Sequence, residues 1–225
     1  IAQLRQQLAQ YEGVTSANLP EEHSASPALD ALLPNRRWRR GWLVEWLAAG
    51  TGAETLALRI AQPFFERGPA VVIDRRGDFY PPAAAAVGVP LEQLTIVRPR
   101  DEAEELWAFE QTLLCPGISV AWLWREKITA RDFRRLQLAA ESSLTIGFLF
   151  RPWQSRGQPT WSHVQWGVTG VRRGEWSVGS AWRMRVELLR CRGQGAVGCV
   201  ELELDEQGTP REVISHDTLP MPLLP

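Results

Sequence analysis

The stretch from Gly41 to Leu58 holds the residues whose types and spacing come nearest to a defined chemistry, the binding of a phosphate by backbone N–H groups. A short apolar strand is predicted to lead into a turn of small residues and then into an amphipathic helix, and this is the arrangement in which a helix N-terminus faces an anion. A working loop of this type follows the pattern G-x-x-x-x-G-K-[ST]. The eight equivalent residues here are Ala48, Ala49, Gly50, Thr51, Gly52, Ala53, Glu54 and Thr55.

Glu54 stands where such a loop carries its phosphate-binding lysine. A carboxylate at that position would repel the β- and γ-phosphates and reverse the electrostatics of the loop. Lys127 is the only lysine in the sequence, so no shift of register restores the pattern. We therefore expect a protein that hydrolyses ATP poorly or not at all and that uses no cofactor.

The histidines and cysteines do not form a catalytic or metal-binding set in the sequence. No nucleophile is paired with His23, His163 or His216, and each is expected to be a solvated or hydrogen-bonded residue. Cys191 and Cys199 flank a predicted turn, but their spacing relative to the histidines does not match that of ligand clusters. The sequence predicts no metal site. Three cysteines and no apolar run of membrane-spanning length favour a cytoplasmic protein without a membrane partner.

Two charged clusters remain open to more than one interpretation. The residues Arg36, Arg37, Trp38, Arg39 and Arg40 could contact DNA, with the indole stacking on a base, or could form a solvated turn. The net charge of −1 indicates that any DNA binding is weak. Asp74 and Asp78 flank a turn after a buried strand, where they could cap the next segment or hold magnesium.

The elements that must position these residues follow from hydrophobic periodicity. Apolar runs of strand length alternate with helical patterns, which predicts an α/β fold with a helix-flanked, mainly parallel sheet. Besides the opening strand and helix, the predicted strands are Ala70–Ile73, Leu94–Val97, Ile118–Leu123 and Leu144–Phe150, and the predicted helices are Tyr80–Val87, Glu102–Leu114 and one from Thr129 to Glu141. The strands at residues 70–73 and 94–97 are expected to be buried.

The period changes to two in the last third of the chain. Apolar residues at 182, 184, 186 and 188, and again at 200, 202 and 204, alternate with charged residues, which predicts an antiparallel hairpin. Arg183 and Arg185 are interpreted as cross-strand partners of acidic residues rather than as a DNA surface. Trp122 and Trp124 differ in parity from Leu123, so at least one of these indoles is expected to be exposed and available to a partner.

The two ends of the chain are predicted to lie outside the core. Residues 1–25 are interpreted as an amphipathic helix and a linker, residues 26–215 as the core, and residues 216–225 as an apolar, proline-rich tail. Both ends carry apolar side chains that could bind a partner protein, and the tail could equally cover an edge of the protein's own sheet. These candidate partner-binding residues are Leu4, Leu8, Leu219, Met221, Leu223 and Leu224.

Taken in order, the segments SPALDALLP, GWLVEWLAAGTGAETLAL, AVVIDRRGDFYPPAA and RRLQLAAE resemble the RecA-like fold, and more narrowly the ImuA-type proteins that accompany bacterial mutagenic polymerases. The resemblance covers residues 26–204. It implies that Arg76 stands where RecA-type ATPases carry a catalytic glutamate. It also implies that the strand at residues 118–124 lacks the magnesium-linked aspartate. The connection after that strand, about five residues, implies a shortened DNA-contacting loop.

The resemblance implies a non-catalytic accessory protein of DNA-damage tolerance. Its partners would be a Y-family polymerase-like protein and an associated replicative-type polymerase, with DNA contact weak if present. Two alternatives stay open: a cell-division inhibitor of the SulA type, and a weak nucleotide-binding ATPase of the RecA family.

Overall fold

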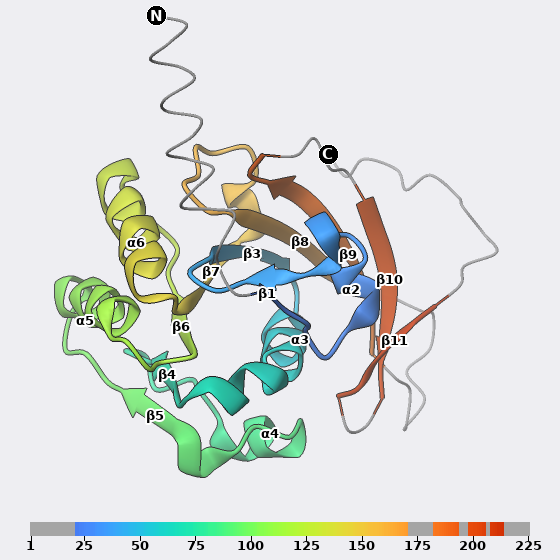
Figure 1. The fold of residues 1–225 in the computed structure, drawn as a ribbon, viewed down its shortest axis with the longest axis horizontal. Coiled ribbons are helices and arrows are strands. Elements are labelled where there is room, and N and C mark those ends of the chain that lie inside the picture. The colour runs from blue at the N-terminus through green and yellow to red at the C-terminus, as the bar shows by residue number, and fades with distance from the viewer. Residues whose placement is uncertain (1–20, 171–181, 194–197, 206–207, 214–225) are drawn as a thin grey trace, which may run out of the picture.

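The computed structural model of the chain describes residues 21–170, 182–193, 198–205 and 208–213 (Figure 1). The predicted helix within residues 1–11 and the apolar tail at residues 216–225 lie outside these described residues. The candidate partner-binding positions Leu4, Leu8, Leu219, Met221, Leu223 and Leu224 lie there too and remain predictions.

The described chain alternates strands and helices through its first two thirds and continues as strands. The strands are β1 (Glu21–Glu22), β2 (Trp38–Arg39), β3 (Leu43–Ala49), β4 (Ala70–Ile73), β5 (Leu94–Val97), β6 (Val120–Trp124), β7 (Ile146–Pro152), β8 (Val164–Gly170), β9 (Trp182–Cys191), β10 (Gly198–Leu204) and β11 (Pro210–Glu212). The α-helices are α2 (Pro27–Asp30), α3 (Ala53–Ile60), α4 (Pro81–Ala86), α5 (Glu102–Leu114) and α6 (Ala130–Ser143). The 3-10 helices are η1 (Pro34–Arg36), η2 (Gln62–Arg67), η3 (Leu91–Gln93) and η4 (Trp153–Ser155).

Nine of the described strands form one sheet in the order β11-β10-β9-β8-β3-β7-β6-β4-β5. The strands from β8 to β5 are mutually parallel, and β9, β10 and β11 continue the sheet in antiparallel pairing. The predicted mainly parallel sheet with a C-terminal antiparallel hairpin is therefore confirmed. One detail is wrong: β5 is an edge strand whose residues are partly or fully exposed, because β4 covers only one of its sides.

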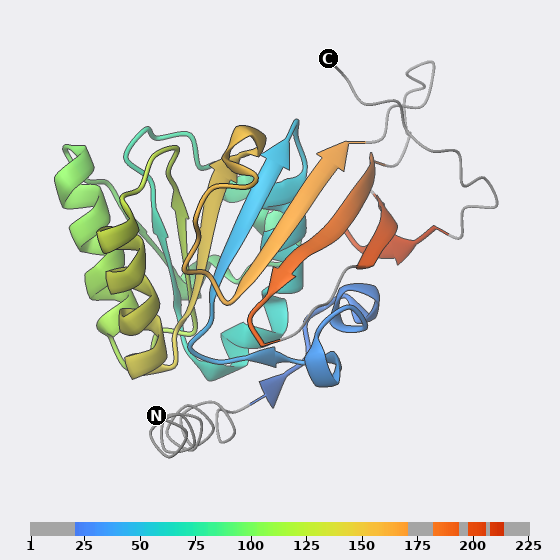
Figure 2. The ribbon, with the colours of Figure 1, turned by 90° about the horizontal axis from the view of Figure 1, so that it is seen from above.

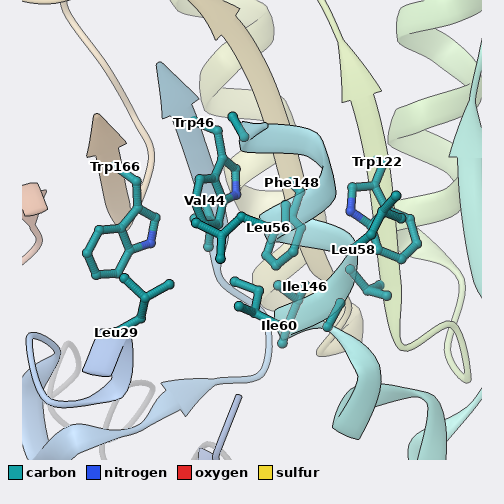
Figure 3. Close-up of a cluster of buried hydrophobic side chains, with 14 of the residues drawn as sticks. Leu29, Val44, Trp46, Leu56, Leu58, Ile60, Trp122, Ile146, Phe148 and Trp166 are labelled. Atoms are coloured by element: carbon teal, nitrogen blue, oxygen red, sulfur yellow. The ribbon is translucent and has the colours of Figure 1, made fainter. Parts of the chain in front are cut away.

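Helices cover both faces of the sheet (Figure 2). Phe109 and Leu113 of α5, with Phe133 and Leu136 of α6, form a core against one face. On the opposite face, α3 packs over aromatic and aliphatic side chains of β3, β6, β7 and β8 (Figure 3). This arrangement places the carboxyl ends of the parallel strands at one edge, where open α/β sheets carry their binding sites.

Short sequence signals determine several element boundaries. The Ser26 hydroxyl accepts from the backbone N–H of Leu29 at the start of α2, and Pro27 takes the first helical position. The Thr129 hydroxyl caps α6 in the same way through the N–H of Asp132. The helix α3 ends before Pro63, and the chain continues as a 3-10 helix.

The N-terminal boundary of the core and one arginine of the C-terminal hairpin differ from the prediction. Residues 21–25, assigned to the linker, belong to the folded body, because β1 pairs with β2 and Ala25 N donates to the carbonyl of Ile60. In the hairpin, Arg183 donates to Glu203 across the strands at 2.6 Å, as predicted. Arg185 faces Glu201 in register but donates to Glu187 of its own strand at 2.8 Å.

Candidate functional site

The turn between β3 and α3 has the backbone of a phosphate-binding loop. Gly50 and Gly52 adopt φ values of 97° and 104°, a region that favours glycine, and Gly52 is the N-cap of α3. A side chain at Gly52 would lie 3.0 Å from the Met184 Cε atom, because β9 packs against the turn. The geometry of the turn therefore depends on glycine at this position.

Glu54 lies in the first turn of α3 and is half-buried. A carboxylate in a first turn interacts favourably with the helix dipole, so here the protein itself places a negative charge near the position of a bound phosphate. Among the described residues, Glu54 has no hydrogen-bond or ion-pair partner. The side chain is available to the solvent and to whatever occupies the neighbouring cavity.

A cavity of about 340 Å³, here called the loop cavity, lies between α3, the end of β4, α4 and the end of β6. Glu54, Arg76, Asp78, Tyr80 and Trp124 contribute to its wall. A shallower cavity of about 290 Å³ adjoins it and shares Glu54, Arg76 and Trp124. The structure thus brings Glu54 and Arg76 to the same edge of the sheet. The motif matches Glu54 to the phosphate-binding lysine, and the resemblance matches Arg76 to the catalytic glutamate. The nearest acid after β6 is Glu126, which is exposed and lines the shallower cavity.

Asp74 shapes one wall of the loop cavity. Its carboxylate accepts hydrogen bonds from the backbone N–H groups of Gly77 at 2.9 Å, Asp78 at 3.0 Å and Phe79 at 3.3 Å. Of the two predicted roles, the structure gives Asp74 the capping one. The carboxylate of Asp78 has no partner among the described side chains, and the adjacent Tyr80 is 67% exposed.

Glu105 of α5 forms another part of the wall. It is buried and accepts from Arg75 Nε at 3.0 Å and from Arg125 Nη1 at 2.7 Å. These two arginines follow β4 and β6, so the ion pairs tie α5 to the ends of two neighbouring strands. The two guanidinium groups therefore stabilise the fold by pairing with Glu105.

A second polar cluster lies inside the sheet and was not recognised in the sequence. Glu45, in the middle of β3, is fully buried; its Oε1 accepts from Arg151 Nη1 at 2.7 Å. Its Oε2 accepts from Thr160 Oγ1 at 2.8 Å and from Gln165 Nε2 at 2.7 Å. Arg151 Nη2 donates to Gln158 at 2.8 Å. A single charged residue within the apolar run of β3 was the only available signal.

The basic segment at residues 36–40 does not have the form predicted for a DNA contact. Trp38 is fully buried, and its Nε1–H donates to Asp30 Oδ1 at 2.8 Å, so this indole is not available to stack on a base, the feature of the DNA-contact alternative. Arg37 and Arg39 lie 3.9 and 3.5 Å from Glu21, and Arg40 lies 3.9 Å from Glu22. The β1–β2 pairing thus supplies acidic neighbours to three of the four arginines, and Arg36 is exposed.

Neither of the paired tryptophans of β6 is fully exposed, and the two differ in burial. Trp122 is fully buried, and Trp124 is partly buried, with its ring stacked on Phe150 at a centroid distance of 4.9 Å. Both indoles pack within the core because helices cover both faces of β6. Trp124 nevertheless reaches the wall of the loop cavity.

His163 is a hydrogen-bonded structural residue, as expected. Its Nδ1 accepts from the N–H of Leu43 at 2.9 Å, so Nε2 donates to Glu141 Oε1, also at 2.9 Å. Burial raises the pKa of Glu141, but the hydrogen bond from His163, with help from Gln137 and Arg192, holds it below its ordinary value overall.

The cysteines, the potential metal ligands and the helix lengths indicate no further site in the described residues. Cys191 is buried, which raises the pKa of its thiol, and Cys199 is exposed; both are free. Within the described ranges no group of histidine, cysteine and acidic side chains is arranged to hold a metal ion. No helix in that part of the chain combines the length and apolarity needed to cross a membrane.

Solved structures confirm the fold. The crystal structure of the RadB recombinase superposes with a TM-score of 0.64 at 15% sequence identity, covering 83% of this chain and 98% of that chain. At this identity the likeness shows the RecA-like recombinase fold alone. No protein-family profile matches the sequence.

Curated relatives extend the comparison to a family. A 72-residue segment is 32% identical to the cell division inhibitor SulA of Edwardsiella piscicida, covering 32% of this chain and 43% of that protein. The similarity to Protein ImuA of two Caulobacter vibrioides strains is much longer: 31% identity over 216 residues, with 89% of this chain and 77% of the relative covered. The chain therefore belongs to the ImuA family.

Proposed function

We propose that this protein is a non-hydrolysing accessory factor of DNA-damage tolerance that acts in the cytoplasm by binding the protein partners of an error-prone polymerase assembly. The partners would be a Y-family polymerase-like protein and its associated replicative-type polymerase. Membership of the ImuA family supports the biological setting. The proposed absence of ATP hydrolysis is supported by the residues of the site itself.

Glu54 carries this proposal. The RecA-like fold is present, and the glycine turn keeps its backbone form, but a carboxylate occupies the position of the phosphate-binding lysine. Arg76 at the end of β4 offers no carboxylate to activate water. The strand β6 contains no acid that could hold magnesium, and Arg125, which follows it, is paired with Glu102 and Glu105. A fold that keeps its framework without these groups is suited to binding rather than to hydrolysis.

Thermal unfolding with and without millimolar Mg-ATP tests the absence of nucleotide binding. A ligand at a hundredfold its dissociation constant adds about 2.7 kcal/mol of stability, and we expect no such gain and no phosphate release. The variant Glu54→Lys supplies the missing lysine and is the matched arm in which any recovered ATP binding would appear. A magnesium-dependent rise in melting temperature of the unmodified protein, lost in Gly52→Val, would contradict the proposal.

Capture of the purified Y-family polymerase-like protein tests the partner-binding half. We expect the full chain to retain that partner, and deletion of residues 219–225 to abolish capture without changing the melting temperature. A truncated protein that melts several degrees lower yet binds normally would show that the tail is structural.

The second candidate, a cell-division inhibitor, is favoured by the 72-residue similarity to SulA. It predicts that expression of this protein alone makes bacterial cells grow as filaments. We expect normal division, because the similarity to ImuA spans most of the chain and that to SulA only a third.

A further inference from the structure

Acidic residues outnumber basic residues on the wall of the loop cavity. Four carboxylates line it, those of Glu54, Asp74, Asp78 and Glu105, against the two guanidinium groups of Arg75 and Arg76. Arg125 pairs with Glu105 beside this wall, so four carboxylates stand against three guanidinium groups and the net charge is negative. An excess of one sign of charge in a cleft raises the local concentration of ligands of the opposite sign.

The charges differ in whether they are already paired. Asp74 is held by three backbone N–H groups, and Glu105 by two arginines. Within the described residues the carboxylates of Glu54 and Asp78 have no partner, and Arg76 forms no ion pair with either of them. Glu54, which is half-buried, and Asp78, which is exposed, both line the cavity and keep their acceptor oxygens unused within the described residues.

The remaining wall is aromatic and aliphatic. Phe79 and Trp124 lie against each other at a centroid distance of 6.4 Å, and the buried residue Leu58 also lines the cavity. Tyr80 is the most exposed large hydrophobic side chain among the described residues, and it stands at this cavity. Aromatic faces next to carboxylates bind a guanidinium group better than an ammonium group, because guanidinium is planar and weakly hydrated and stacks on rings.

We propose that the loop cavity, which lies beside the glycine turn at the start of α3, binds an arginine side chain presented by a partner protein. The guanidinium would pair with Glu54 and Asp78, and its aliphatic stem would lie against Tyr80, Phe79 and Trp124. This inference rests on the proposed function, because it assumes that no nucleotide competes for the cavity.

The probe for the test is N-acetyl-arginine-N-methylamide, with the neutral isostere N-acetyl-citrulline-N-methylamide as its matched control. Binding to the full chain is followed by NMR at the indole N–H of Trp124, which is assigned with Trp124→Phe. We expect the arginine compound to bind at least about tenfold more tightly than the citrulline compound, because only the former makes charge-assisted hydrogen bonds.

Variants locate the interaction. We expect Glu54→Gln and Asp78→Asn each to weaken arginine binding, and Glu54→Lys to abolish it. Glu212→Gln, a change of the same kind on the exposed strand β11, should leave binding unchanged. Retained melting temperatures exclude unfolding as the cause.

The outcomes separate the two proposals. Equal binding of the two compounds, or no shift of the Trp124 indole with either, would overturn the arginine site and leave the absence of ATP hydrolysis untouched. A shift of the same indole by Mg-ATP in the unmodified protein, with no shift by the arginine compound, would overturn both.

Discussion

Two glutamates in one strand–turn–helix unit, Glu45 and Glu54, have opposite environments. Glu45 lies in the centre of β3, is fully buried and accepts hydrogen bonds from Arg151, Thr160 and Gln165. Glu54 lies in the first turn of α3, is half-buried and has no partner among the described residues. The two residues are separated by one strand end and one glycine turn.

The comparison teaches that a carboxylate's role follows from what surrounds it. A buried charge is tolerated only when it is paired and hydrogen-bonded, so the partners of Glu45 are required for the fold. Glu54 costs the fold little, because it stays near water and interacts favourably with the dipole of α3. Only the second glutamate is free to take part in recognition, and the predictions below test this division.

The largest effect is expected from Glu45→Ala. This change leaves the Arg151 guanidinium buried without a counter-charge, and removing one partner of a buried ion pair costs about 3–5 kcal/mol. Urea denaturation measures the change in the free energy of unfolding. A loss below about 1 kcal/mol would show that Glu45 and Glu54 are energetically alike and would remove the contrast.

The double variant Glu45→Met/Arg151→Met is the control for that experiment. It removes both charges and keeps apolar volume, so we expect it to be less destabilised than the sum of the two single variants by more than about 1 kcal/mol. Additive losses would mean that the two side chains do not act as a pair.

An intermediate effect is expected from Glu141→Gln. The folded pKa of Glu141 lies below its ordinary value, so its charged form stabilises the folded protein above the unfolded pKa, and this contribution is lost as the pH falls through the folded pKa. Because Glu141 is partly exposed, the loss at neutral pH should be less than about 1 kcal/mol. It should shrink below the ordinary glutamate pKa of about 4.3. Unfolding curves from pH 7 to pH 3 measure it.

Glu22→Gln sharpens this test because the pKa of Glu22 is raised in the folded protein, whereas that of Glu141 is lowered. Burial raises the pKa of Glu22 although Arg40 and Arg67 oppose the shift, so its charged form disfavours the folded state. The glutamine variant should be the more stable protein near neutral pH, with the gain fading as the pH falls. The same trend in both variants would contradict the assigned environments.

The smallest effect is expected from Glu54→Gln. Surface changes outside a hydrogen-bond network usually alter stability by no more than about 0.5 kcal/mol, and only the dipole interaction of Glu54 is lost. Urea denaturation of this variant alongside Glu45→Ala compares the two changes in the free energy of unfolding directly. A loss above about 2 kcal/mol would show that Glu54 is a structural residue and would weaken its assignment to the cavity.

Much of the fold could be predicted because its signals are local. The apolar runs of β4 and β6 and the caps at Ser26 and Thr129 each depend on a few neighbouring residues. The burial of Trp38 could not be predicted, because its neighbours in sequence are arginines, while its hydrogen-bond partner and the aromatic rings around it come from other elements. The edge position of β5 depends on strand order, which periodicity does not encode.

The sequence alone determined the chemistry that is missing at the glycine turn, because a side chain's charge belongs to the residue: Glu54 is an acid in any fold, and no lysine lies near it. Only the tertiary structure decided which acids are paired. Glu45 meets Gln165 across 120 residues, and Glu105 meets Arg75 across 30, whereas Glu54 and Asp78 meet no partner in the described part of the chain and line one cavity. Pairing and burial depend on residues far apart in the chain that the sheet brings together, so these contacts emerge only when the strands are in order.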